Sequence, residues 1–173
     1  DMAELEMLVQ GGFHWVMHSL YQAELLKTLL QKLPASTKPA LNIWIKINTG
    51  MNRLGLPVAD LQKIWSWLQS LALPGERVLM SHFATADEQQ HVLANTQQRQ
   101  FAEITRSLSG ATGASLSASA GIVCRPDAHH SIVRPGIMMY GGSPMWDAAA
   151  SDFGLKPVMS LKSRLLTINQ VKA

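Results

Sequence analysis

Polar or glycine-rich groups follow short apolar segments at four successive places in this chain, and this pattern constrains the fold most. The four segments are Lys46–Gly55, Ser81–Phe83, Ser117–Gly121 and Val133–Ile137. Parallel strands bring their carboxyl ends to one edge of a sheet, and barrels of parallel strands build their active sites there. The pattern therefore predicts one site assembled from successive strand ends.

Apolar periodicity predicts alternating strands and helices. Leucines at steps of three and four indicate a helix before Pro34, and Ile43, Ile45 and Ile47 share one face of a strand, opposite Lys46. The predicted strands are Phe13–His18, Leu41–Ile47, Glu76–His82, Ser115–Ser119 and one within Val133–Tyr140, and the helices are Leu20–Leu33, Val58–Leu71 and Glu88–Leu108.

A strand–helix repeat of roughly thirty residues indicates an α/β fold with parallel strands. A partial (β/α)8 TIM-type barrel is one solution, and an open doubly wound sheet is the other. No Gly-x-Gly-x-x-Gly turn of the second type follows a strand. About five units fit in this length and a closed barrel needs eight, so the sheet is either open or lacks strands upstream.

The alternation of predicted strands and helices stops near residue 145. Residues 1–145 are expected to form the barrel part, Trp146–Gly154 a linker, and Pro157–Val171 the first one or two strands of a mainly β domain spanning 146–173. The chain begins with Asp1 rather than Met, so we expect a fragment of a longer protein.

Composition excludes several functions. The net charge is +3 without a run of three basic residues, which argues against nucleic-acid binding, and no apolar stretch is long enough to span a membrane. Cys124 is the single cysteine, and His129 and His130 lack partners at ligand spacing, so no metal site is expected. A reducing, cytoplasmic location fits, and a periplasmic one stays open if a signal precedes Asp1.

Several residues suit an anionic ligand. Ser119, Gly136 and Ile137 follow strands, where hydroxyl and backbone N–H groups can hold a phosphate; tight turns alone would also explain them. Arg134 needs an acceptor, and Asp127 or solvent is the simpler choice. A buried Lys46 would be a nucleophilic amine, with Arg53 in reach of the same cavity; alternatively, Lys46 lies at the strand end and reaches solvent. His82 is either a structural residue or an orienting one.

Taken together, these segments resemble bacterial alanine racemases. The resemblance rests on Lys46-x-Asn-Thr-Gly-Met-x-Arg53-Leu-Gly55, Ser81-His82-Phe83-Ala84, Ser117-x-Ser119, Arg134-Pro-Gly-Ile137 and Tyr140-Gly141, and it runs from about Leu5 to Lys172. It implies a barrel that binds pyridoxal 5'-phosphate (PLP), a following β domain and a homodimer. The implied reaction interconverts L- and D-alanine for peptidoglycan precursor supply.

The resemblance also implies roles. Arg134 would face the pyridine nitrogen and keep it unprotonated, which favours racemisation over transamination, and His82 would orient Arg134. Ser119, Gly136 and Ile137 would hold the phosphate. Arg53 would approach the cofactor's phenolic oxygen and the substrate carboxylate, beside a Lys46 that is often carbamylated in this family. Ala118 stands where many relatives carry Asn, so that amide contact is missing.

Two groups that the resemblance requires are not in this chain. One is the lysine that carries PLP, in an upstream segment, and the other is a tyrosine of the β domain; Tyr21 and Tyr140 match neither. We therefore expect the chain by itself to be inactive. A broad-specificity racemase of the same fold and a non-catalytic PLP-binding barrel are the alternatives.

Overall fold

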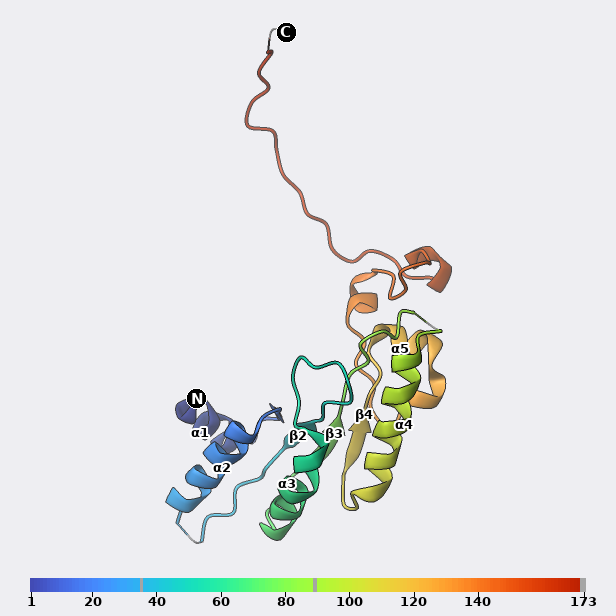
Figure 1. Cartoon of the computed structure of the whole chain (residues 1–173). Coiled ribbons are helices and arrows are strands. Elements are labelled where there is room, and N and C mark those ends of the chain that lie inside the picture. The colour runs from blue at the N-terminus through green and yellow to red at the C-terminus, as the bar shows by residue number, and fades with distance from the viewer. Residues whose placement is uncertain (35, 89, 172–173) are drawn as a thin grey trace.

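A computed structural model describes residues 1–34, 36–88 and 90–171. Its centre is a four-stranded parallel sheet in the order β1 (Trp15–Met17), β2 (Ile43–Lys46), β3 (Arg77–Met80) and β4 (Gly113–Ser115). Spatial order equals chain order, and helices connect the strands (Figure 1). The prediction of a parallel α/β fold is thereby confirmed.

The connecting helices match the predicted ones closely. They are α2 (Leu20–Lys32), α3 (Val58–Ser70) and α4 (Val92–Ser107). Ser19 caps α2 by accepting a hydrogen bond from the backbone N–H of Gln22, which satisfies one of the free donors of the first turn. Pro34 follows the end of α2, as the sequence predicts.

The helix at the N-terminus was not predicted from the sequence. Helix α1 (Met2–Gln10) precedes the first strand and packs against α2. Its first turn is closed by a capping box between Asp1 and Glu4. Only Leu5 and Val9 of this helix are buried, so its apolar stripe was too narrow to stand out as a periodic signal.

The hydrophobic core lies between the sheet and the helices. Ile43, Ile45 and Ile47 are fully buried on the side that faces the helices, as predicted from their alternation. The other core residues of this layer include Leu26 and Leu29 of α2, Leu61, Ile64 and Leu68 of α3, and Phe101 and Ile104 of α4. Lys46 and Trp44 point to the opposite face and stay partly exposed.

Two strand predictions at the carboxyl side of the sheet are wrong. The fourth strand is Gly113–Ser115, not Ser115–Ser119, and Ser119 begins the short helix α5 (Ser119–Cys124). The alternating serines gave a strand-like pattern for another reason. Their hydroxyls bond the segment that follows α5: the Ser115 hydroxyl donates to Ile132 O and that of Ser117 to Ala128 O.

The predicted fifth strand within Val133–Tyr140 is reduced to one bridge, between Ala118 and Arg134. Pro135 has no N–H to extend a ladder beyond this point. The next residues form the 3-10 helix η2 (Ile137–Tyr140), which Gly141 ends with a left-handed φ of 81°.

Helix α4 begins four residues later than predicted, because the chain before it turns: Glu88 N–H donates to Thr85 O and His91 N–H donates to Glu88 O. The predicted helix also included Gln89, and the family resemblance reached Lys172; both lie outside the described residues. Two further 3-10 turns are η1 (Pro126–Ala128) and η3 (Ala150–Phe153).

The C-terminal segment does not form the predicted strands. Residues 155–171 carry no regular structure, and the segment extends away from the rest of the chain (Figure 1). A strand needs a neighbouring edge for its backbone groups. Among the described residues, the backbone hydrogen bonds of this segment are those from Leu155 N to Ala150 O and from Val158 N to Tyr140 O, which are too few to form a strand ladder. None of the described helices is long and apolar enough to cross a membrane.

Candidate functional site

Arg134 is held at the carboxyl edge of the sheet by the ends of two strands. Its Nη2 donates to Ser81 O, after β3, at 2.6 Å and to Leu116 O, after β4, at 3.4 Å. Its Nη1 donates to the hydroxyl of Ser115. Burial lowers the pKa of Arg134 but leaves a guanidinium charged at neutral pH. The geometry therefore fixes a permanent positive charge in place with carbonyl and hydroxyl acceptors.

His82 lies against Arg134, with its Nδ1 3.3 Å from Arg134 Nη2. Burial and the nearby charges of Arg134, Lys46 and Arg53 lower the pKa of His82 to about 4. The ring is therefore neutral at pH 7, so Nδ1 can accept a hydrogen bond from the guanidinium while Nε2 carries the ring's own hydrogen. Such a contact fixes the orientation of both groups.

Lys46 is the last residue of β2, and the loop that follows carries Arg53 to the same edge. Its base is closed by bonds from Leu56 N to Lys46 O and from Asn48 N to Leu56 O, and the Asn48 side chain accepts from the N–H groups of Gly50 and Asn52. At Gly55, φ is +128° and an added Cβ would lie 2.6 Å from Asn48 N, so this position needs glycine.

Among the described residues, the three cations at this edge, Lys46, Arg53 and Arg134, have no acidic partner. Desolvation first, then the charges of Arg134 and Arg53, lowers the pKa of Lys46. The salt bridges found in residues 1–34, 36–88 and 90–171 involve none of Lys46, Arg53 or Arg134. Like charges gathered in a half-buried site repel one another. The site is therefore electrostatically suited to an anion.

A cavity of about 380 Å³ lies beside this cluster and is lined by His82, Ser119 and the Gly136–Ile137 turn, among others. The buried Ser119 hydroxyl accepts hydrogen bonds from Gly136 N at 2.8 Å and Met138 N at 3.4 Å. One hydroxyl and two converging N–H groups form the kind of pocket that binds phosphate oxygens. The structure thus brings Ser119, Gly136, Ile137 and His82 to one cavity, while Lys46, Arg53 and Arg134 do not line it.

Sequence reasoning missed several residues of this wall. Met51, Phe83, Asp87, Gly121 and Pro144 also line the cavity. Gly121 allows a close approach, since an added Cβ would lie 2.9 Å from the Ser117 hydroxyl and 3.2 Å from the Phe83 ring. Two of these residues could have been found from the sequence, because Met51 lies within the segment Lys46–Gly55 and Phe83 directly follows His82.

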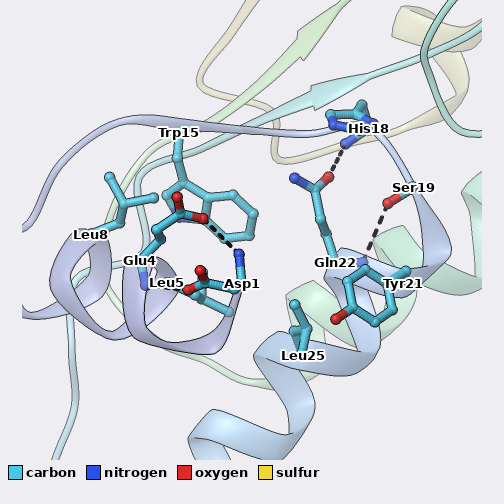
Figure 2. Close-up of a pocket in the computed structure, with 10 residues that line it drawn as sticks. All are labelled: Asp1, Glu4, Leu5, Leu8, Trp15, His18, Ser19, Tyr21, Gln22 and Leu25. Carbon is cyan, nitrogen blue, oxygen red and sulfur yellow. Dashed lines mark hydrogen bonds and ion pairs between the residues drawn. The ribbon is translucent and has the colours of Figure 1, made fainter.

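A second cavity, of about 270 Å³, lies between α1 and α2 (Figure 2). In this cavity His18 N–H donates to the side-chain oxygen of Gln22, and the amino group of Asp1 donates to Glu4. Its remaining lining is mostly apolar, with Leu5, Leu8, Trp15 and Leu25. It contains none of the predicted site residues. Within the described part of the chain, no group of three or more His, Cys, Asp or Glu side chains could hold a metal ion.

The sequence matches a known family over most of its length. The family model described as "Alanine racemase, N-terminal domain" matches residues 1–144. An alanine racemase from Hahella chejuensis is 45% identical over 166 residues, which are 92% of this chain and 43% of that protein. One from Azoarcus sp. is 38% identical over 173 residues, which cover all of this chain and 46% of that protein.

Solved structures of alanine racemases resemble this chain as well. The biosynthetic alanine racemase from Pseudomonas aeruginosa superposes with a TM-score of 0.81 at 34% identity, over 91% of this chain and 42% of that one. The enzyme from Acinetobacter baumannii gives a TM-score of 0.78 at 35% identity, with 91% and 44% covered. The chain thus spans less than half the length of these relatives. On this sequence and structural similarity, the chain belongs to the alanine racemase family.

Proposed function

We propose that this chain forms the cofactor-holding wall of a PLP-dependent alanine racemase, which interconverts L- and D-alanine for peptidoglycan precursor supply. The observation that carries the proposal is the cluster of Lys46, Arg53 and Arg134, which lies next to the Ser119 cavity and has no acidic partner in the part of the chain that the structure describes. PLP bears a phosphate, a phenolic oxygen and a ring nitrogen, and this set of cations, donors and small residues fits those groups.

Each residue has a definite task in this proposal. Ser119 and the N–H groups of Gly136 and Met138, which bond one another in the structure, would bind phosphate oxygens. The Arg134 guanidinium would donate to the ring nitrogen, and His82 would keep it aligned. Arg53, exposed on its loop, would contact the phenolic oxygen and the substrate carboxylate. When bound, PLP supplies the electron-withdrawing ring that acidifies the α-carbon of alanine.

Lys46 would contribute a carbamate formed on its side-chain amine. Its lowered pKa enlarges the neutral fraction, which can add carbon dioxide and release a proton to form a carbamate. That anion would lie among the positive charges of Arg53 and Arg134, where it would be stabilised and would in turn orient Arg53.

The two proton-transferring groups of the reaction would come from outside this chain. No lysine lines the Ser119 cavity in the described part of the structure. The described tyrosines are exposed, Tyr21 by 67% and Tyr140 by 58%. We therefore propose that the chain is inactive by itself and that the whole protein acts as a homodimer.

The experiment uses pyridoxine 5'-phosphate, a PLP analogue without the aldehyde, so that binding reports the pocket rather than adducts on surface lysines. We expect equilibrium dialysis to show binding of this analogue but much weaker binding of pyridoxine, which lacks the phosphate. Ser119→Ala should weaken binding of the analogue by about tenfold or more, since a hydrogen bond to a charged group contributes roughly 1.5–3 kcal/mol.

The matched control is Ser107→Ala, the same change at an exposed position of α4, which should leave the affinity unchanged. Equal affinity for the two ligands would contradict the phosphate pocket. D-alanine formation by the chain with PLP should not exceed that of PLP alone; a higher rate would contradict the proposed inactivity. A broad-specificity racemase would share this site, and a panel of amino acids tested on the whole protein separates the two.

A further inference from the structure

Gln97 of helix α4 is a buried polar side chain that the reaction scheme does not use. It has no exposed surface, and it does not line the Ser119 cavity. A buried amide without partners would destabilise the fold by several kcal/mol, so its contacts indicate what it holds in place.

Those contacts join α4 to the loop after β3. Gln97 Nε2 donates to His82 O at 2.9 Å, and Gln97 Oε1 accepts from Ala84 N at 2.9 Å. The side-chain amide therefore pairs with the backbone on both sides of Phe83, as a neighbouring strand would. This fixes the backbone of His82, whose ring contacts Arg134.

The same amide reaches the loop that carries Arg53. Gln97 Nε2 lies 3.4 Å from Thr49 Oγ1, which lies 2.7 Å from the hydroxyl of Ser81. The Ser81 hydroxyl donates to Ile47 O, and Ser81 O accepts from Arg134. Thr49 and Ser81 are almost fully buried, so the network is shielded from water. Hydrogen bonds in such an interior are stronger than in water, and water cannot replace them when they are lost.

From this geometry we infer that Gln97 is a positioning residue, which fixes the positions of the His82 ring and the Arg134 guanidinium without touching the ligand. It also couples these two groups to the loop that carries Arg53. The inference deepens the proposed function and rests on it, since His82, Arg134 and Arg53 are the residues assigned to the cofactor. The network itself belongs to the chain without any ligand, so it can be tested separately.

The test compares Gln97→Met with Gln100→Met in the full 173-residue chain. Methionine has a similar volume and no amide. Gln100 lies on the same helix, is partly exposed, and serves as the matched control. Nuclear magnetic resonance gives two readouts without ligand: the exchange rate of the Ala84 amide and the titration of the His82 ring, which faces the charges of Arg134, Lys46 and Arg53.

We expect Gln97→Met to accelerate exchange of the Ala84 amide by roughly tenfold or more. It should also raise the pKa of His82 from about 4 toward its ordinary 6.5, because the released loop exposes the ring to water. Gln100→Met should change neither. If Gln97→Met does not fold, Gln97→Asn takes its place with the same expectation: it keeps a buried amide but withdraws it by one methylene.

A folded variant at position 97 with unchanged Ala84 exchange and unchanged His82 titration would overturn the inference. Binding of pyridoxine 5'-phosphate completes the design. If the wild-type chain binds it and the variant binds it several-fold less tightly, both proposals are supported. If the wild-type chain does not bind it, the proposed function fails, while the two ligand-free readouts still decide the role of Gln97.

Discussion

At the scale of the residue, the site combines permanent positive charges with a histidine that is kept neutral. Arg134 is held by the carbonyl oxygens of Ser81 and Leu116 rather than by a carboxylate. A carboxylate there would neutralise the guanidinium, whereas carbonyl dipoles position it and leave its charge available to a ligand. Neutral His82 completes this arrangement, because a protonated ring could not accept from Arg134.

The lowered pKa of His82 predicts a pH dependence of stability. The folded ring titrates near pH 4 and the unfolded ring near 6.5, so between these values the unfolded chain binds more protons. The free energy of unfolding should therefore fall as the pH drops from 6.5 toward 4. The full shift corresponds to roughly 3 kcal/mol, and partial exposure of the ring reduces the expected loss to about 1–2 kcal/mol.

Urea unfolding of the chain between pH 4 and 7 measures this loss, and His82→Gln should flatten the curve. The flattening should be incomplete, because burial also lowers the pKa of His130. His14→Gln, at an exposed position, is the matched control and should keep the wild-type slope. A His82→Gln variant with the full wild-type slope would show that other groups cause the loss.

Sequence patterns indicated some of these residues and not others. His82 and Arg134 stand in short motifs after apolar segments, so their place at one sheet edge could be expected. Gln97 gave no such signal, because nothing in a polar helix distinguishes a buried glutamine from its exposed neighbours. Its role depends on a contact between residues 97 and 82 that only the folded chain creates.

At the scale of the element, periodicity predicted helices better than it predicted strands. In α3 the apolar residues recur at the spacing of one helix face, and all four are buried: Leu61, Ile64, Trp65 and Leu68. The strands are only three or four residues long, which is too short for a period-2 pattern to mark an end. The segment Ser115–Ser119 was wrongly predicted as a strand for this reason, since small residues fit a strand, a turn or a helix start equally well.

The packing of α3 onto the sheet predicts a large effect of one core substitution. Leu68 is fully buried, so Leu68→Ala should lower the free energy of unfolding by about 2–5 kcal/mol, through lost apolar burial and the cavity left behind. Chemical denaturation monitored by circular dichroism measures the change. Leu161→Ala is the same substitution at a fully exposed position, and it should change stability by less than about 0.5 kcal/mol.

If Leu68→Ala were as mild as Leu161→Ala, α3 would not be packed onto the sheet as the structure has it. The comparison is sharp because both variants remove the same atoms, and only burial differs between them.

At the scale of the whole molecule, the sequence predicted the class of fold and the gathering of the polar segments at one edge of the sheet, but not the extent of the sheet. The spacing of units indicated parallel α/β structure, which the order β1-β2-β3-β4 confirms. Whether a barrel closes depends on strands that pair with the outer edges, and no local pattern in this chain carries that information. The mainly β domain from residue 146 onward stays a prediction for the same reason, since its strands need partners.

The segment after Met159 illustrates this dependence on partners. Leu161, Leu165, Leu166 and Ile168 are each more than four-fifths exposed. Water-exposed apolar residues in an extended backbone offer a template for pairing with another chain. The segment therefore adds a tendency to associate without adding to the stability of the sheet and its helices.

Removal of residues 160–173 should accordingly leave the melting temperature within about 2 °C of the full chain, because residues 160–171 are exposed and their removal costs little buried surface. It should also reduce light scattering at high protein concentration. Replacing Leu161, Leu165, Leu166 and Ile168 by serine is the matched control, which keeps the length and removes the apolar side chains, and it should reduce scattering as much. A fall of several degrees on truncation would instead show that the segment packs on the body of the protein, and its exposed leucines would then belong to a surface that forms within one chain.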